Sequence, residues 1–245
     1  MRNKVVILCM LPVIFFSCGK LATKFIVSVH NNSFLYSKIT NADREVIYLP
    51  MIHLNKREYY QMIKHKVDSL RNAGYKVFYE SVAVSPALDK TARETVYRKF
   101  RNRVGFVPMD YFSDKNSQHP QLKVRNYIMQ DFENTGIKPD KDRRADLPMD
   151  SLVLLYEKRF GEILLTDCDR KTEIGHKYKC RPADREDYNF IVRKIRDEHL
   201  LHAILSSKLP KIVVLFGQEH EKALKANLQL ADHSWKWSYH YQKIP

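Results

Sequence analysis

Residues 45–80 of the chain read EVIYLPMIHLNKREYYQMIKHKVDSLRNAGYKVFYE, and this stretch decides the fold. Its first part, 45–52, is an apolar run typical of a buried strand. Apolar residues then recur at helical spacing over 56–73, and Gly74 stands where the end of a helix favours a left-handed residue. Residues 76–80 form a second strand pattern. A strand, a helix and a strand in so short a stretch predict two parallel strands joined by a right-handed crossover.

Each of these strands is followed by a side chain that can do chemistry. His53 comes just after the first strand and Glu80 ends the second, while a third apolar run, 211–216, leads to His220. The carboxyl ends of parallel strands converge on one crevice, where ligands bind. His53, Glu80 and His220 are therefore predicted to meet there, either to hold a divalent metal or to perform acid–base catalysis. Taken singly, each histidine has a simpler interpretation, as a hydrogen-bonding residue that anchors a loop.

The remaining patterns predict a single α/β domain. We expect a central mixed, mostly parallel sheet flanked by helices, with a helical insertion in the middle third. Asn55 is expected to cap the helix at 56–73. The further strands are expected at 33–39 and 235–241, and the further helices at 88–104, 121–133, 148–161, 185–207 and 221–230.

The N-terminus has the features of a bacterial lipoprotein signal. Arg2 and Lys4 precede an apolar run, 5–16, that is shorter than the roughly 20 residues of a bilayer span but fits a signal peptide. Cys18 follows directly, between Ser17 and Gly19, and is predicted to carry the lipid. The alternative is ordinary secretion with cleavage nearby.

We therefore expect a signal peptide at 1–17, a tether at 18–32 and one domain at 33–245. The lipid on Cys18 would anchor the protein to the cell envelope, on the periplasmic or the outer-membrane surface.

Charge and cysteine content are consistent with export. The formal net charge of the chain is +14, which favours contact with anionic envelope surfaces. A nucleic-acid partner is not expected, because an exported protein rarely meets one and the chain contains no motif for base readout. Cys168 and Cys180 flank a polar stretch and are predicted to form a disulfide, since disulfides persist outside the cytosol. A metal site formed by Cys168, His176 and Cys180 is the alternative.

Five elements of the chain resemble the TraB/TIKI superfamily, from about Phe34 to Trp237. The second Gly-x-x-His motif of that family is similar to Gly217-Gln218-Glu219-His220, and its strand-ending glutamate is similar to Glu80. Its late arginine pair resembles Arg196-Asp197, and its mid-chain Ala-Asp-Val element resembles Ala145-Asp146-Leu147. The first Gly-x-x-His motif keeps His53 but has Pro50 in place of the glycine.

This resemblance implies a metal-dependent, peptidase-like hydrolase that acts on a peptide or a small molecule. His53, Glu80 and His220 would bind manganese, cobalt or zinc, or Glu80 would act as general base. Arg196 would contact the substrate or a developing oxyanion, and the resemblance adds Asp197 and Asp146 to the substrate-binding residues.

Two alternatives belong to other classes of protein. The fold is also related to ChaN-like haem-binding lipoproteins and to erythromycin esterases, so a non-catalytic lipoprotein that binds a ligand such as haem in the same crevice is the first alternative. Pro50 favours this interpretation. The second alternative is a structural envelope protein that retains only the fold.

The helix pattern at 185–207 gives a partial test of the role expected of Arg196. At 100° per residue, Asp197 and Glu198 fall on its apolar face, where a carboxylate must be paired. Both are therefore expected to face the crevice, whereas Arg196 falls off that face. His199 and His202 are spaced to chelate a metal, but exposed histidines are the simpler interpretation.

Overall fold

The computed structural model describes residues 33–107, 127–182 and 184–243 of the chain. The predicted signal peptide, the tether and Cys18 lie outside the described residues. Within the described part, no helix combines the length and the apolar character that a membrane crossing requires.

The described residues form an α/β fold around a six-stranded sheet whose strand order is β6-β4-β7-β2-β1-β8. The pairs β6–β4, β4–β7 and β7–β2 are parallel, whereas β2–β1 and β1–β8 are antiparallel. The predicted mixed, mostly parallel sheet is therefore confirmed. The strands are β1 (Ser33–Thr40), β2 (Glu45–Met51), β4 (Lys76–Tyr79), β6 (Arg143–Arg144), β7 (Lys211–Gly217) and β8 (Lys236–Lys243).

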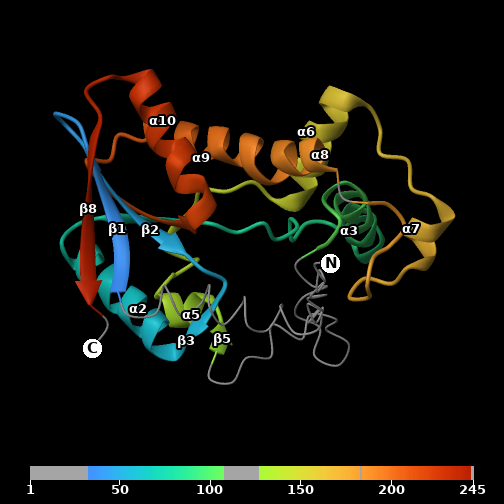
Figure 1. Ribbon diagram of the computed structural model, residues 1–245, viewed down its shortest axis with the longest axis horizontal. Helices are drawn as coiled ribbons and strands as arrows, with labels where there is room; N and C mark the ends of the chain where they lie inside the picture. Colours follow the sequence, from blue (N-terminus) through green and yellow to red (C-terminus); the bar gives the residue numbers. More distant parts are fainter. Residues whose placement is uncertain (1–32, 108–126, 183, 244–245) are drawn as a thin grey trace, which may run out of the picture.

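The strand β7 lies between β2 and β4, the two strands of the predicted βαβ unit. Its residues 212–216 are all buried, as expected for a central strand covered on both faces. On one face it contacts the cluster formed with α2 (Arg57–Asn72), and on the other the cluster formed with α9 (Ile195–Leu205) and α10 (Glu221–Ala231). Figure 1 shows α2 and α10 on opposite sides of the sheet.

The start of α2 differs from the sequence-based expectation. Its N-cap is Lys56, without a side-chain cap, and the Asn55 side chain instead accepts from the Lys56 amide. Asn55 belongs to β3 (Leu54–Lys56), which pairs with β5 (Tyr127–Met129) in a small second sheet. The prediction that Asn55 caps the helix is therefore wrong. The end of α2 agrees with expectation, since Gly74 has φ +88°.

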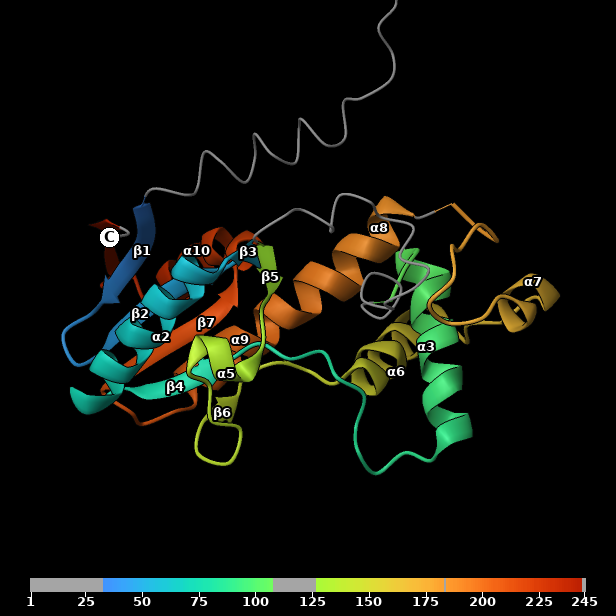
Figure 2. The ribbon, with the colours of Figure 1, turned by 90° about the horizontal axis from the view of Figure 1, so that it is seen from below.

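The predicted helical insertion is present as a lobe beside the sheet (Figure 2). We call the helical lobe the set α3 (Lys90–Val104), α6 (Met149–Phe160), α7 (Asp167–Lys171), α8 (Arg185–Tyr188) and the π-helical segment η2 (Asn189–Lys194). Its apolar side chains form a cluster separate from the two that flank the sheet. The segment η2 continues directly into α9, so one long helical run joins the lobe to the sheet.

The predicted helix over 121–133 is wrong in its described part. Residues 127–129 form β5, because they pair with β3. The Asp131 side chain then caps a separate short helix, α5 (Phe132–Thr135), through a capping box with Asn134. Phe132 is exposed as a consequence, although the sequence pattern placed it inward.

Cys168 and Cys180 are joined by a disulfide with a Cα–Cα distance of 5.6 Å, the pairing that the sequence indicates. With both sulfurs bonded to each other, the alternative metal site with His176 is not present. The loop that the disulfide closes offers backbone carbonyls to α3: Arg98 donates to Asp169 and Thr172, and the buried Arg101 donates to Thr172 and Glu173.

Removal of this disulfide is expected to lower the free energy of unfolding by about 3 kcal/mol, the value for closing a loop of this length in the unfolded chain. The double variant Cys168→Ala/Cys180→Ala should show the loss in urea denaturation at neutral pH. Wild-type protein measured with and without reductant provides the control. Equal denaturation midpoints in all three samples would contradict this expectation.

Candidate active site

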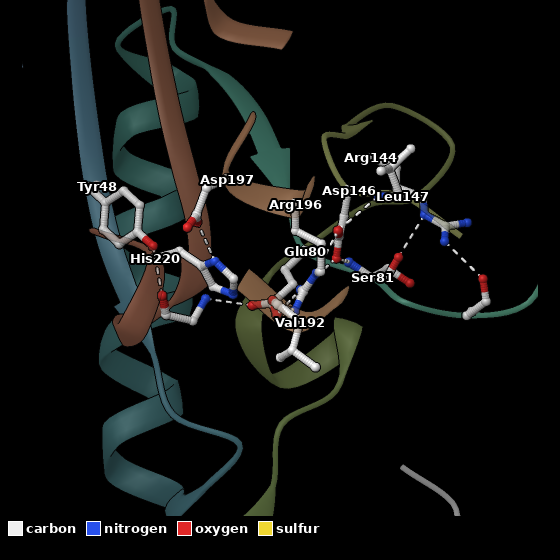
Figure 3. A network of polar contacts seen from close by, with 12 residues as sticks. Tyr48, Glu80, Ser81, Arg144, Asp146, Leu147, Val192, Arg196, Asp197 and His220 are labelled. Atoms are coloured by element: carbon white, nitrogen blue, oxygen red, sulfur yellow. Dashed lines mark hydrogen bonds and ion pairs between the residues drawn. The ribbon is translucent and has the colours of Figure 1, made fainter. Parts of the chain in front are cut away.

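The carboxyl ends of β4 and β7 bring two predicted site residues together (Figure 3). Glu80 directly follows β4, and its amide donates to the carbonyl of Leu215 in β7 at 3.0 Å. The Glu80 side chain then turns back to β7, where its Oε2 accepts from the Gly217 amide at 2.5 Å. A Cβ atom at Gly217 would lie 3.2 Å from Glu80 Oε2 and 3.4 Å from His220 Cδ2. A side chain at this position would therefore crowd the carboxylate and the imidazole, which glycine avoids.

The guanidinium of Arg196 is the centre of a buried ion network. Arg196 donates to Asp146 through Nε at 2.9 Å and through Nη2 at 2.8 Å, and Nη2 also donates to Glu80 Oε1. Its Nη1 donates to the Val192 carbonyl at 3.2 Å. Burial disfavours the charged guanidinium, but the charges of Asp146 and Glu80 outweigh this effect and raise the pKa of Arg196.

The prediction that Arg196 lies off the buried face of its helix is wrong, because Arg196 is itself buried. The buried face of α9 includes Leu200, Ala203 and Ile204, and Arg196 lies in the middle of it. The apolar Leu205, which the sequence pattern counts as inward, is exposed. Glu198, which the same pattern placed inward, is exposed.

Asp146 is fixed from its own side of the network. Its Oδ2 accepts from the Ser81 amide at 3.1 Å and its Oδ1 from the Leu147 amide at 2.8 Å. The carboxylate therefore bridges the end of β4 to Arg196. Asp146 and Glu80 together neutralise the arginine, which leaves Arg196 without a free donor pair for a substrate carboxylate.

His220 and Asp197 form a second pair at the same edge. His220 Nδ1 lies 2.6 Å from Asp197 Oδ1, and both residues are buried. The imidazole also meets the ring of Phe216 edge-on, with centroids 5.0 Å apart. In the tautomer in which Nδ1 donates to Asp197, the lone pair of the ring lies on Nε2. No hydrogen bond to Nε2 is found among the described residues, so this nitrogen is placed to accept a proton.

Tyr48 supports the same edge, although the sequence reading did not include it. Its hydroxyl donates to the Gly217 carbonyl at 2.7 Å. Burial, and secondarily the charge of Glu80, raises the pKa of Tyr48 well above its ordinary value. The hydroxyl therefore stays protonated and fixes the peptide of Gly217. Its position in β2, two residues before Pro50, is the sequence feature that could have placed Tyr48 near this edge.

His53 lies at this edge but outside both hydrogen-bonded groups. Its backbone is held, since its carbonyl accepts from the Gln130 amide at 2.9 Å. Its side chain is exposed, and its charge contributes to the lowered pKa of Glu80. The structure therefore brings together Glu80, Asp146, Arg196, Asp197 and His220, and leaves the exposed His53 outside their contacts.

The described residues, as arranged, do not fit a divalent metal. They contain no group of three or more His, Cys, Asp or Glu side chains able to hold an ion. Both oxygens of Glu80 are engaged, one by the Gly217 amide and one by the cationic Arg196. A metal would have to compete with that guanidinium for the same carboxylate.

Because of Glu80, the stability of the protein is expected to fall at acid pH. Burial alone would raise its pKa, but the charges of Arg196, His53 and His220 lower it below the ordinary value. In the unfolded chain a glutamate has a pKa of roughly 4.3. A carboxylate whose pKa is lower than this in the folded state contributes its full stabilisation of the fold above pH of about 4.3. That stability is lost as the pH falls through the folded-state pKa.

Below pH of about 4.3, the free energy of unfolding of the wild type should therefore fall more steeply than that of Glu80→Gln. Urea denaturation at a series of pH values measures the two slopes. Glu198→Gln, which changes an exposed carboxylate on the same helix as Arg196, is the control and should follow the wild type. Parallel curves for wild type and Glu80→Gln would refute the assignment.

Comparison of the chain with known protein families, with curated proteins and with solved structures gives no match.

Proposed function

We propose that the chain is a hydrolase of the bacterial cell envelope that acts on a peptide or a small molecule, with a metal-independent mechanism in place of the metal-dependent one that the TraB/TIKI resemblance implies. The observation that carries this proposal is the pairing of His220 with Asp197 at the carboxyl edge of the sheet. A buried carboxylate that orients an imidazole and leaves its other nitrogen free is the arrangement of a general base.

In this mechanism His220 Nε2 takes a proton from water as the water attacks the substrate carbonyl. Asp197 stabilises the imidazolium that forms, and the proton then passes to the leaving group. Glu80 and Arg196 have positioning roles, because each is engaged by the other and by Asp146 or Gly217. The exposed His53 is the remaining group able to donate to the developing oxyanion.

A hydrolase screen of the purified full chain tests this proposal. Ester, amide and peptide substrates are offered with and without a chelator, and His220→Asn is compared with His202→Asn, a change at an exposed histidine of α9. We expect turnover that persists in chelator and is lost only in His220→Asn. Turnover that chelator abolishes would favour the metal-dependent mechanism with His53, Glu80 and His220. Equal activity of both variants would overturn the role of His220.

A non-catalytic ligand-binding protein is the second candidate, and Pro50 favours it. Pro50 lies in β2 beyond the last residue that pairs with β1, where its missing N–H is tolerated. For haem, the exposed His53 imidazole is the side chain at this edge suited to an axial ligand. Titration with haem should then give a Soret band in the wild type that His53→Ala loses, without any hydrolysis.

The anchor of the protein is tested separately. Cys18→Ala should release the protein from membranes, since an attached lipid contributes about 0.8 kcal/mol per buried CH₂. Fractionation of cells that express the wild type or the variant measures this, and mass spectrometry of the wild type should show the added lipid. Cys168→Ala/Cys180→Ala, which also removes cysteines, is the control and should stay with the membrane. An unmodified Cys18 would contradict the anchor.

A further inference from the structure

The strand β8 is the last strand of the six-stranded sheet, and its outer edge has no strand partner among the described residues. It is eight residues long and pairs with β1 along its whole length on the other side. A long edge strand presents a row of backbone donors and acceptors that can pair with another strand. Figure 1 shows β8 at the outside of the sheet.

One face of β8 carries three exposed aromatic side chains. Trp237, Tyr239 and Tyr241 are 38%, 55% and 73% exposed, respectively. They alternate along the strand and so share the face of the sheet that α10 covers further inward. Lys225 of α10 lies 4.0 Å from the centre of the Tyr239 ring and is itself ion-paired with Glu221. Its charge is therefore neutralised within the chain.

We propose that the partner of this edge is a second copy of the chain, with the two β8 strands antiparallel and centred on Tyr239. A two-fold axis perpendicular to the sheet keeps each face of the strand on its own side. Trp237 then lies opposite Tyr241 of the second copy, and Tyr239 opposite Tyr239 of the second copy. All the exposed aromatic side chains of the strand find aromatic partners, which is a stabilising cross-strand arrangement.

The charges of the strand favour the same register. The chain is strongly cationic, with a formal net charge of +14, so the register that keeps the lysines of the strand away from other cations adds least to the repulsion between two copies. With Tyr239 at the centre, Lys236 lies opposite the uncharged Gln242. Centring on Ser238 would put Lys236 opposite His240, and centring on His240 would leave Trp237 without an aromatic partner. Both of these registers also leave fewer aromatic pairs.

The dimer edge is connected to the candidate active site through α10. Lys225 Nζ donates to Ser37 Oγ at 2.7 Å and to Glu221 Oε1 at 2.5 Å, and Glu221 directly follows His220. The side chain that packs on Tyr239 therefore also holds the first turn of the helix behind the imidazole. This inference does not depend on the proposed hydrolysis.

The oligomeric state of the full chain in detergent tests the proposal, by size exclusion with light scattering over a dilution series. We expect the wild type to have the mass of two copies, and Tyr239→Lys, which places two cations opposite each other, to have half that mass at the same concentration. Leu230→Lys, a change at an exposed apolar residue of α10, should remain dimeric. A wild type that is monomeric at every concentration would overturn the proposal.

Cross-linking tests the register independently of the effect of lysine on folding. Under mild oxidation Tyr239→Cys should form a disulfide-linked dimer with itself, whereas Tyr241→Cys alone should not. Tyr241→Cys mixed with Trp237→Cys should cross-link as a pair. Wild type oxidised in the same way shows how much cross-linked dimer the native cysteines form by themselves. Cross-linking of Tyr241→Cys with itself, or none by Tyr239→Cys, would refute this register.

Discussion

Replacement of Arg196 by methionine is expected to lower the free energy of unfolding by about 3–5 kcal/mol. The change keeps most of the side-chain volume but removes the charge that Glu80 and Asp146 share. Their side chains are 9% and 0% exposed, so both carboxylates would remain buried without a counter-charge. Urea denaturation at pH 7, followed by circular dichroism, measures the loss.

Arg193→Met provides the matched control. Arg193 lies one turn earlier in the same helical run and is ion-paired with Glu219, but the two side chains are 47% and 68% exposed. An exposed pair of this kind contributes about 0–1 kcal/mol. If the free energy of unfolding fell by the same small amount in both methionine variants, the buried network would not stabilise the fold. In Arg196→Met, the further changes Glu80→Gln and Asp146→Asn should restore part of the loss, because they remove the unpaired charges.

Much of the sheet could be predicted because its signals are local. The parallel arrangement of β2 and β4 follows from a strand, a helix and a strand in 36 residues. The edge position of Glu80 follows from the same unit, and the buried run 212–216 identified β7 as a strand. Asn41 and Asp43, polar turn residues between two strand patterns, likewise indicate the hairpin of β1 and β2.

The rest depends on contacts between distant segments. The short strand β5 exists because it pairs with β3, more than 70 residues earlier in the chain, and no local pattern indicates that pairing. The apolar residues of the last long helix do not show which of its faces is buried, because Leu205 is exposed whereas Arg196 lies among the buried residues of α9. The family resemblance was therefore sufficient to select Arg196, Asp197 and Asp146, but only the folded chain shows that Arg196 is buried in an ion network and that Asp197 contacts His220.

The second large effect concerns His220 and applies to whichever substrate the hydrolase screen identifies. Substitution of His220 by alanine should lower kcat by about 10²–10⁴-fold, the usual contribution of a general base. Asp197→Asn should also lower kcat strongly, because an amide can donate to Nδ1 and then places the proton on Nε2, the wrong nitrogen for a base. Both variants should retain a KM close to the wild type, since neither residue is proposed to bind substrate in the ground state.

Chemical rescue distinguishes this catalytic role from a structural one. Free imidazole should restore part of the activity of His220→Ala, because the small ring can occupy the space that the side chain leaves beside Phe216 and Asp197. It should not restore Asp197→Asn, in which the native imidazole is present but carries its proton on the wrong nitrogen. His202→Asn, on the exposed side of α9, should match the wild type. If imidazole rescued neither variant and both lost stability in proportion to activity, the pair would be a structural hydrogen bond, and the base would have to be sought at His53.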